Sequence, residues 1–208
     1  VDVVVLEEHP EMAEFRKLLE GSSLVSEDNS KKRFVGKGLK VFNTYHYTIY
    51  VPSNGAIIDL QNRGELPTWD DVQHAIVAED EATAEALTKV IEDFLKFHIQ
   101  DYALFIGAKP EPENGYETAL INDKGKFERV YSTLTGDGIT IKNGQNPNAN
   151  GYMESHVLKT EGLYNLQARE YLLDAEQYDV NNTGLVLYTS STAVIHLIDK
   201  PLKVAAKQ

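Results

Sequence analysis

Two β-rich segments constrain the fold of this chain more than any other part of its sequence. In residues 47–54, aromatic residues alternate with β-branched ones, a pattern that favours an extended strand. Pro52 cannot donate a hydrogen bond to a neighbouring strand, so we expect the strand to end there. Ser53 or Asn54 can then cap a following helix, because both side chains accept hydrogen bonds from backbone amides.

The second β-rich segment covers residues 192–200, close to the end of the chain. Successive side chains of a strand point to opposite faces, which places Val194, His196 and Ile198 on one face. Ile195 and Leu197 lie on the other. Since both faces are mainly apolar, we expect both to be covered in the folded protein.

The clearest helical pattern lies between the two segments. Apolar residues recur on one side of a helix, and charged residues occupy the rest of its circumference. The sequence therefore predicts a long amphipathic helix whose apolar face carries Ala84, Leu87, Val90, Ile91, Phe94, Leu95 and His98.

Two shorter helices are expected before it. Apolar residues at helical spacing follow Pro10 and end at Gly21, which predicts a helix near the N-terminus. Thr68 followed by Asp71 three residues later predicts a capping box at the start of another helix. Residues 22–38 are polar and contain glycines, so a loop is expected there, followed by a strand over residues 39–51.

Beyond residue 100 the pattern changes to alternation interrupted by glycine turns, which predicts strands. A hairpin turn is expected over residues 122–125. The segment 164–172 favours a strand, although residues 166–173 also fit a helix. Helices early and strands late indicate an α+β fold. The expected strands of this half cover residues 102–106, 117–121, 127–134, 138–141, 164–172 and 185–189.

Composition narrows the function classes. The formal net charge of −12 would repel phosphate backbones and anionic lipid headgroups, which argues against nucleic acid as a partner. The chain has no cysteine, so disulfides, thiolate nucleophiles and cysteine metal ligands are excluded. No apolar run is long enough to cross a bilayer, so no transmembrane segment is expected.

The order of these segments resembles the fasciclin-like domain. The first β-rich segment is similar to a signature of that family that runs through a strand into Pro-Thr-Asn, with Tyr50 for the usual Phe and Ser53 for Thr. The second is similar to its closing strand. Phe97 and His98 stand where the family has a Tyr-His pair, so the phenolic hydroxyl is missing. The matching positions are Thr48, Ile49, Tyr50, Val51, Pro52, Ser53 and Asn54, then Val194, Ile195, His196, Leu197, Ile198 and Asp199.

The resemblance implies a fold and a role. The expected fold is a single fasciclin-like domain over residues 1–208, with a β-sandwich or wedge core and N-terminal and flanking helices. The implied function is a non-catalytic adhesion or binding module, extracellular or attached to the cell envelope, as in bacterial surface lipoproteins. Its partner would be a protein or carbohydrate, with neighbouring domains of the same type in a longer protein. The two signature strands should share one β-core.

The polar residues of the signature segments are expected to be structural. His98 and His196 lie among apolar residues, so we expect hydrogen-bonded core histidines rather than metal ligands. Asn54 and Asp199 are better explained by hydrogen bonds to nearby backbone than by acid-base chemistry. No histidine pair has the spacing of a metal site, and no nucleophile motif is present, so we expect neither a metal, a cofactor nor catalytic residues.

Tyrosines next to polar loops are the candidate contact residues. Long polar loops carry new binding specificity more often than the core does. Tyr116, Tyr152 and Tyr178 lie in or beside such loops, and tyrosine suits contact with glycans or proteins.

Two other functions remain open. The many carboxylates and tyrosines would also suit a hydrolase that acts on glycans, an enzyme class that uses two carboxylates on either side of the bond that breaks. A carrier of a small ligand is the other alternative, with a pocket between the helical and β parts.

Overall fold

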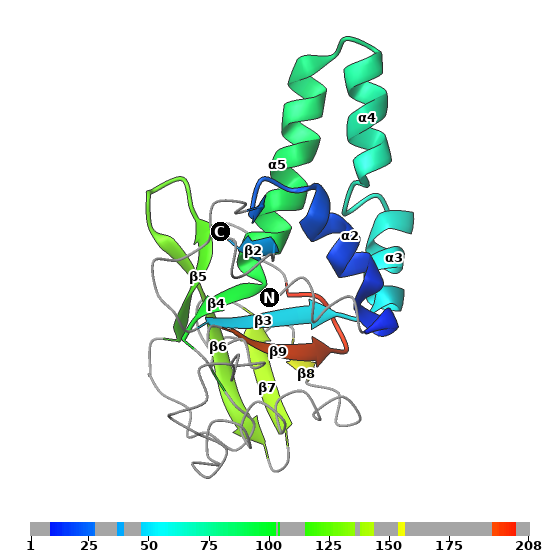
Figure 1. The fold of residues 1–208 in the computed structure, drawn as a ribbon. Coiled ribbons are helices and arrows are strands. Elements are labelled where there is room, and N and C mark those ends of the chain that lie inside the picture. The colour runs from blue at the N-terminus through cyan, green and yellow to red at the C-terminus, as the bar shows by residue number, and fades with distance from the viewer. Residues whose placement is uncertain are drawn as a thin grey trace, which may run out of the picture.

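A computed structural model of the chain describes residues 9–27, 37–39, 47–102, 104, 115–135, 138–143, 154–156 and 193–202. All the described helices lie before residue 98, and only strands follow them (Figure 1). The predicted α+β class is confirmed. The predicted strands at residues 164–172 and 185–189 lie outside the described residues, and the single domain over residues 1–208 stays a prediction.

The described strands form one mixed sheet and one small separate pair. The main sheet has seven strands among the described residues, in the order β8-β7-β6-β5-β4-β3-β9. All neighbours in it are antiparallel except β3 and β9. Its strands are β3 (Tyr47–Pro52), β4 (Ile99–Asp101), β5 (Tyr116–Ile121), β6 (Phe127–Thr135), β7 (Gly138–Asn143), β8 (Glu154–His156) and β9 (Ala193–Ile198).

The two signature strands lie side by side. β3 and β9 run parallel, in a register that joins Tyr47 to Ala193 at one end and Pro52 to Ile198 at the other. Parallel neighbours need a long crossover, and here the crossover contains most of the chain. The expectation that both segments share one β-core is therefore confirmed.

The helices stand on one side of this strand pair (Figure 1). α2 and α3 lie close to β3, whereas α4 and α5 form a hairpin that projects away from the sheet. The helical elements are η1 (Pro10–Met12), α2 (Ala13–Gly21), α3 (Asn54–Asn62), α4 (Trp69–Val77) and α5 (Glu81–Phe97).

Alternation along β3 and β9 divides the core between the two faces of the sheet. Ile49, Val51, Ile195 and Leu197 belong to a cluster that the helices complete. Tyr50 and Ile198 belong to a second cluster, together with residues of β5 and β6. The sequence predicted that β9 is covered on both faces, and the burial of residues 195–198 confirms it.

Local signals set the helix and turn boundaries. The Ser53 hydroxyl accepts from the Ala56 amide and so begins α3 directly after Pro52. Thr68 and Asp71 form the predicted capping box of α4. The predicted turn at residues 122–125 joins β5 to β6, and Gly125 has the positive φ of 70° that this turn requires.

The helix predicted to carry His98 ends one residue earlier. His98 is the C-cap of α5, and its carbonyl accepts a hydrogen bond from the Tyr50 amide at 2.8 Å, which draws the chain into the sheet. Of the strand predicted over residues 102–106, Tyr102 and Leu104 are not in a strand, and residues 103, 105 and 106 lie outside the described residues. The strand that follows α5 is instead β4, from Ile99 to Asp101. Tyr102 follows that strand with a φ of 86°, which a strand cannot continue.

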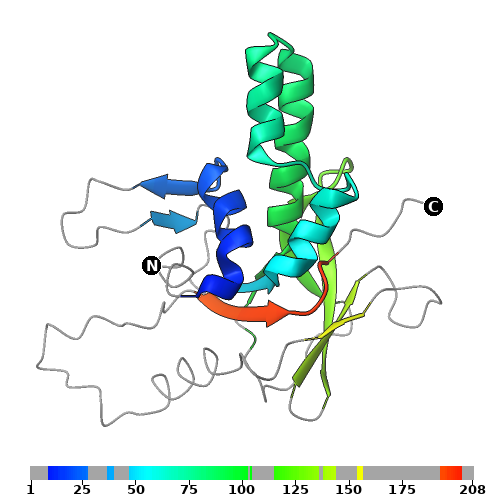
Figure 2. The same cartoon turned by 90° about the vertical axis from the view of Figure 1, so that its right-hand side faces the viewer.

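The loop predicted over residues 22–38 contains strands. β1 (Val25–Glu27) pairs antiparallel with β2 (Lys37–Leu39), so the prediction of an unpaired loop was wrong there. This pair stands beside α2, apart from the main sheet (Figure 2). The strand predicted over residues 39–51 corresponds to the end of β2 and most of β3, and residues 40–46 lie outside the described residues.

Candidate binding groove on the helical hairpin

The projecting hairpin of α4 and α5 carries a groove of about 700 Å³. Its apolar part comes from Val72 and Ile76 on α4 and from Ala84 on α5. Polar residues from successive turns of α5 line the other side. They are Glu81, Glu85, Thr88, Lys89 and Glu92, and Glu79 lies between the two helices.

A tight connection holds the two helices together at the tip. The Glu79 amide donates to the Ile76 carbonyl and the Asp80 amide donates to the Ala75 carbonyl, which is the Schellman arrangement at a helix end. Glu79 has a φ of 58°, the conformation in which glycine is usual. Asp80 then begins α5 by accepting from the Thr83 amide.

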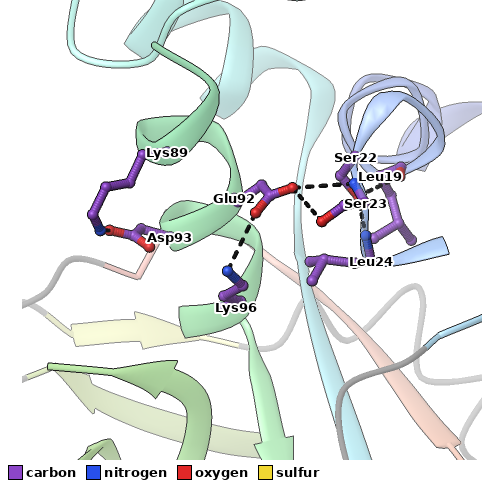
Figure 3. A network of polar contacts seen from close by, with 8 residues as sticks. All are labelled: Leu19, Ser22, Ser23, Leu24, Lys89, Glu92, Asp93 and Lys96. Carbon is purple, nitrogen blue, oxygen red and sulfur yellow. Dashed lines mark hydrogen bonds and ion pairs between the residues drawn. The ribbon is translucent and has the colours of Figure 1, made fainter. Parts of the chain in front are cut away.

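The base of the groove is tied to the end of α2 (Figure 3). Glu92 Oε1 accepts from the Ser23 amide at 3.1 Å and from its hydroxyl at 2.6 Å. Lys96 Nζ donates to Glu92 Oε2 at 3.3 Å. Partial burial works to raise the pKa of Glu92, but the hydrogen bonds from Ser23 and the charge of Lys96 outweigh it, so that pKa is lowered.

The open side of the groove is acidic. Within the described part of the chain, Glu79, Glu81 and Glu85 make no ion pair, and all three are exposed. The one lysine of the lining, Lys89, is engaged by Asp93 one turn along α5. The groove therefore combines an apolar floor with three glutamates, Glu79, Glu81 and Glu85, that pair with no cation of the described residues.

The signature residues lie elsewhere, in the sheet. The Thr48 hydroxyl donates to the Tyr102 carbonyl at 2.8 Å and accepts from the Leu104 amide at 2.9 Å. His196 Nε2 donates to the Leu104 carbonyl at 2.6 Å. Each of the two signature strands thus contributes one side chain, Thr48 or His196, that bonds the backbone just after β4.

The buried histidines are hydrogen-bonded, as the sequence predicted. His98 Nε2 accepts from the Leu202 amide at 2.9 Å, so Nδ1 carries the proton and donates to the Phe94 carbonyl at 2.7 Å. His196 stacks on Tyr50. Burial lowers the pKa of both histidines to about 4, although each backbone hydrogen bond opposes the shift.

The remaining signature residues join elements through the backbone. The Asn54 side chain accepts from the Glu14 amide at 3.0 Å and donates to the Pro10 carbonyl at 2.8 Å, which fixes α3 against the start of α2. Pro52 lies opposite Ile198 at the end of the parallel pair. Asp199 is half-buried directly after β9.

Of the three predicted contact tyrosines, the structure describes only Tyr116. Tyr116 is the first residue of β5, and its buried side chain stacks on Tyr102 at a ring distance of 5.7 Å. Tyr102 is 58% exposed and is the surface member of this pair, although the sequence did not single it out as a contact residue. Tyr152 and Tyr178 lie outside the described residues, and a contact role for the three predicted tyrosines stays a prediction.

Sequence reasoning missed the groove. Its one visible signal was the excess of apolar residues at the end of α4, where Ile76 and Val77 are 53% and 73% exposed. Ile76 follows Val72 by four residues, a helical spacing that predicts burial on the same face as Val72. It lies in the last turn of α4, next to the connection to α5, and the hairpin projects away from the body of the protein (Figure 1).

No protein-family model matches this chain. No curated protein matches it by sequence.

Two further properties concern the described residues. Among them, no three or more histidine, aspartate or glutamate side chains gather where they could hold a metal ion. None of the helices described there has the length and apolar character to span a membrane.

Proposed function

We propose that this chain is a non-catalytic binding module of the fasciclin-like type. The observation that carries the proposal is the parallel pairing of β3 with β9, which joins the two segments on which the resemblance rests. These segments are far apart in the sequence, so their pairing is not a consequence of local structure. The wedge-shaped core of that family belongs to the proposal as well.

The use of the signature side chains supports a structural role for them. Thr48 bonds the backbone of Tyr102 and Leu104, and His196 bonds the backbone of Leu104. His98 bonds the Phe94 carbonyl and the Leu202 amide. A histidine that spends its ring nitrogens on buried backbone groups has little capacity for proton transfer with a substrate. This supports a module that binds rather than reacts.

The proposed setting is the cell surface or envelope, with a protein or carbohydrate as partner. Domains of the same type would adjoin it in a longer protein. The net charge of −12 fits a partner that is neutral or basic.

A binding screen tests this function. The purified chain, immobilised on a sensor, is exposed to a panel of extracellular proteins and to a glycan array, and the same glycans are assayed for hydrolysis. We expect saturable binding to at least one panel member and no turnover. Hydrolysis of a glycan that is lost on replacing a pair of carboxylates would overturn the proposal and favour the glycan hydrolase.

One observation favours the small-ligand carrier as a second candidate. A pocket of about 200 Å³ lies between α3, α5 and the residues after β9, and its apolar lining includes Leu66, Phe94 and Leu202. This volume is below the roughly 300 Å³ at which ligand pockets usually begin. A thermal shift with small metabolites that disappears in Leu66→Trp would support the carrier, because a ligand of the folded state raises its stability.

A further inference from the structure

We propose that the groove between α4 and α5 binds a basic amphipathic segment of a partner protein. This inference rests on the proposed binding function and names the site and the chemistry of the partner. The occupant would place apolar side chains against Ile76 and lysine or arginine side chains against Glu81 and Glu85.

The apolar part of the argument is the exposure of α4. Ile76 is 53% exposed over a groove whose floor is formed by Val72 and Ala84. Its neighbour Val77 is more exposed still. Covering these side chains with an apolar partner is favourable, and an amphipathic helix laid in a groove is a common way to do so.

The electrostatic part of the argument is the negative charge of the groove's rim. Glu79, Glu81 and Glu85 are exposed and have no ion-pair partner among the described residues, while Lys89 is held by Asp93. Glu92, at the base, already receives hydrogen bonds from Ser23 and Lys96. The one cation of the lining, Lys89, is thus already paired with Asp93, and a basic segment would supply partners for the three glutamates.

Glu79 contributes a third observation. It occupies a helix end at positive φ, where glycine would be more stable, and its side chain lines the groove. A residue that lowers stability at one position and places charge in a groove fits a binding role, since function is often retained at the expense of stability.

The favoured partner is a different protein rather than a second copy of this chain. Each copy carries a net charge of −12, so two copies repel each other as they approach. The chain has one basic run, at residues 31–40, whose charge is opposite to that of the groove. Self-association is therefore an outcome that the test must detect.

The probe is a helical peptide of about 18 residues with leucine on one face and lysine on the other, long enough to lie along both helices. Two control peptides carry glutamate in place of lysine, or the same composition in scrambled order. We expect the leucine-lysine peptide to bind in fluorescence anisotropy, and to bind less tightly as salt rises from about 50 to about 300 mM. Equal binding of the scrambled peptide would overturn the proposal.

Paired variants then locate the site. Ile76→Ser should weaken binding about fivefold or more, whereas Ile121→Ser, on β5 and equally exposed at 55%, should not. Glu85→Gln should weaken it about threefold, and Asp59→Asn, an exposed position on α3, should leave it unchanged. Equal effects of the groove and control variants would show that the peptide binds elsewhere and overturn the proposal.

Glu79→Gly separates binding from folding. Glycine relieves the positive φ, so the variant should unfold at a temperature a few degrees higher and still bind the peptide more weakly. Weaker binding in a more stable protein supports the groove as the site. Unchanged affinity in this variant would remove Glu79 from the rim and contradict the proposal.

Two further measurements distinguish the remaining outcomes. Light scattering that shows a dimer, dispersed by Ile76→Ser, would replace the foreign partner by a second copy. Panel binding that persists unchanged in Ile76→Ser and Glu85→Gln would reject the groove and leave the binding function intact. Glycan turnover without any binding partner would reject the function itself.

Discussion

At the residue scale, polar side chains inside the sheet fix the backbone. Thr48 holds the segment after β4 through two hydrogen bonds, and His196 holds the same segment from β9. His98 closes α5 and receives the Leu202 amide. Each of these side chains is fully buried, and the hydrogen bonds to Leu104 and Leu202 satisfy backbone groups that would otherwise be buried without a partner.

The buried histidines should make the protein less stable in mild acid. Burial lowers the pKa of both His98 and His196 from 6.5 to about 4. Between these two pH values the histidines are protonated in the unfolded chain and neutral in the folded protein. The free energy of unfolding therefore falls as the pH falls. The free energy of unfolding should drop by about 2 kcal/mol per histidine between about pH 7 and about pH 5.

Urea unfolding at both pH values measures this drop. Below about pH 4 the two states carry the same charge on these rings, so the histidine contribution should level off there. His98→Gln removes one of the two titrating groups, so in this variant the free energy of unfolding should drop by about half as much between the two pH values. A midpoint that stays constant from neutral to mildly acidic pH would show that the rings are not held neutral.

At the element scale, α2 serves as the support for the helical hairpin. The Trp69 indole nitrogen, on the first residue of α4, donates to the Leu18 carbonyl at 3.0 Å. Gly21 ends α2 directly against the same ring, and Glu92 binds Ser23 two residues later (Figure 3). The hairpin that carries the groove is therefore anchored at its base, where it leaves the body of the protein.

Gly21→Ala should loosen this anchor. A Cβ atom at Gly21 would lie 2.6 Å from Trp69 Cε2, too close for any real contact. The gain in helix propensity, up to about 1 kcal/mol, is smaller than the typical cost of forcing an extra methyl into a packed site, about 1–3 kcal/mol. We expect a net loss of stability.

Gly55→Ala is the matched control, because nothing lies within 4 Å of a Cβ atom there. It should leave stability unchanged or raise it by up to about 1 kcal/mol. Trp69 is the one tryptophan of the chain, so its fluorescence reports on the anchor directly. A Gly21→Ala protein with unaltered emission and an unaltered unfolding midpoint would contradict this packing.

At the scale of the whole molecule, the parallel pair of β3 and β9 is the centre of the structure. Residues of both strands contribute to the two hydrophobic clusters on the opposite faces of the sheet. The α4–α5 hairpin extends away from this centre (Figure 2). Stability should therefore be highest in the strand pair and lower toward the tip of the hairpin.

Amide hydrogen exchange tests this distribution. Protection should be greatest in β3 and β9 and smaller in α4. Ile49→Ala, at a fully buried position of β3, should cost about 2–5 kcal/mol and lower protection in β9 as much as in β3.

Val77→Ala, at an exposed position of α4, serves as the comparison and should change stability by no more than about 0.5 kcal/mol. If β9 stayed protected when Ile49 was truncated, the two strands would not unfold as one unit.

Much of the local structure followed from the sequence. The capping box at Thr68, the turn that ends at Gly125 and the helix of residues 81–97 each depend on neighbours a few positions away. Such signals are complete within a short window. The predictions were wrong where the deciding contact lies outside that window. At His98, for example, the carbonyl accepts a hydrogen bond from the Tyr50 amide of a distant strand, and the helix ends there.

The sequence by itself determined the α+β class, the alternating faces of β3 and β9 and the burial of the two histidines, because side-chain periodicity and hydrophobicity act locally. Only the tertiary structure decided that β3 and β9 are parallel neighbours and that an acidic groove opens between α4 and α5. Pairing between distant strands and the space between packed helices depend on how whole elements meet, and no short stretch of sequence carries that information.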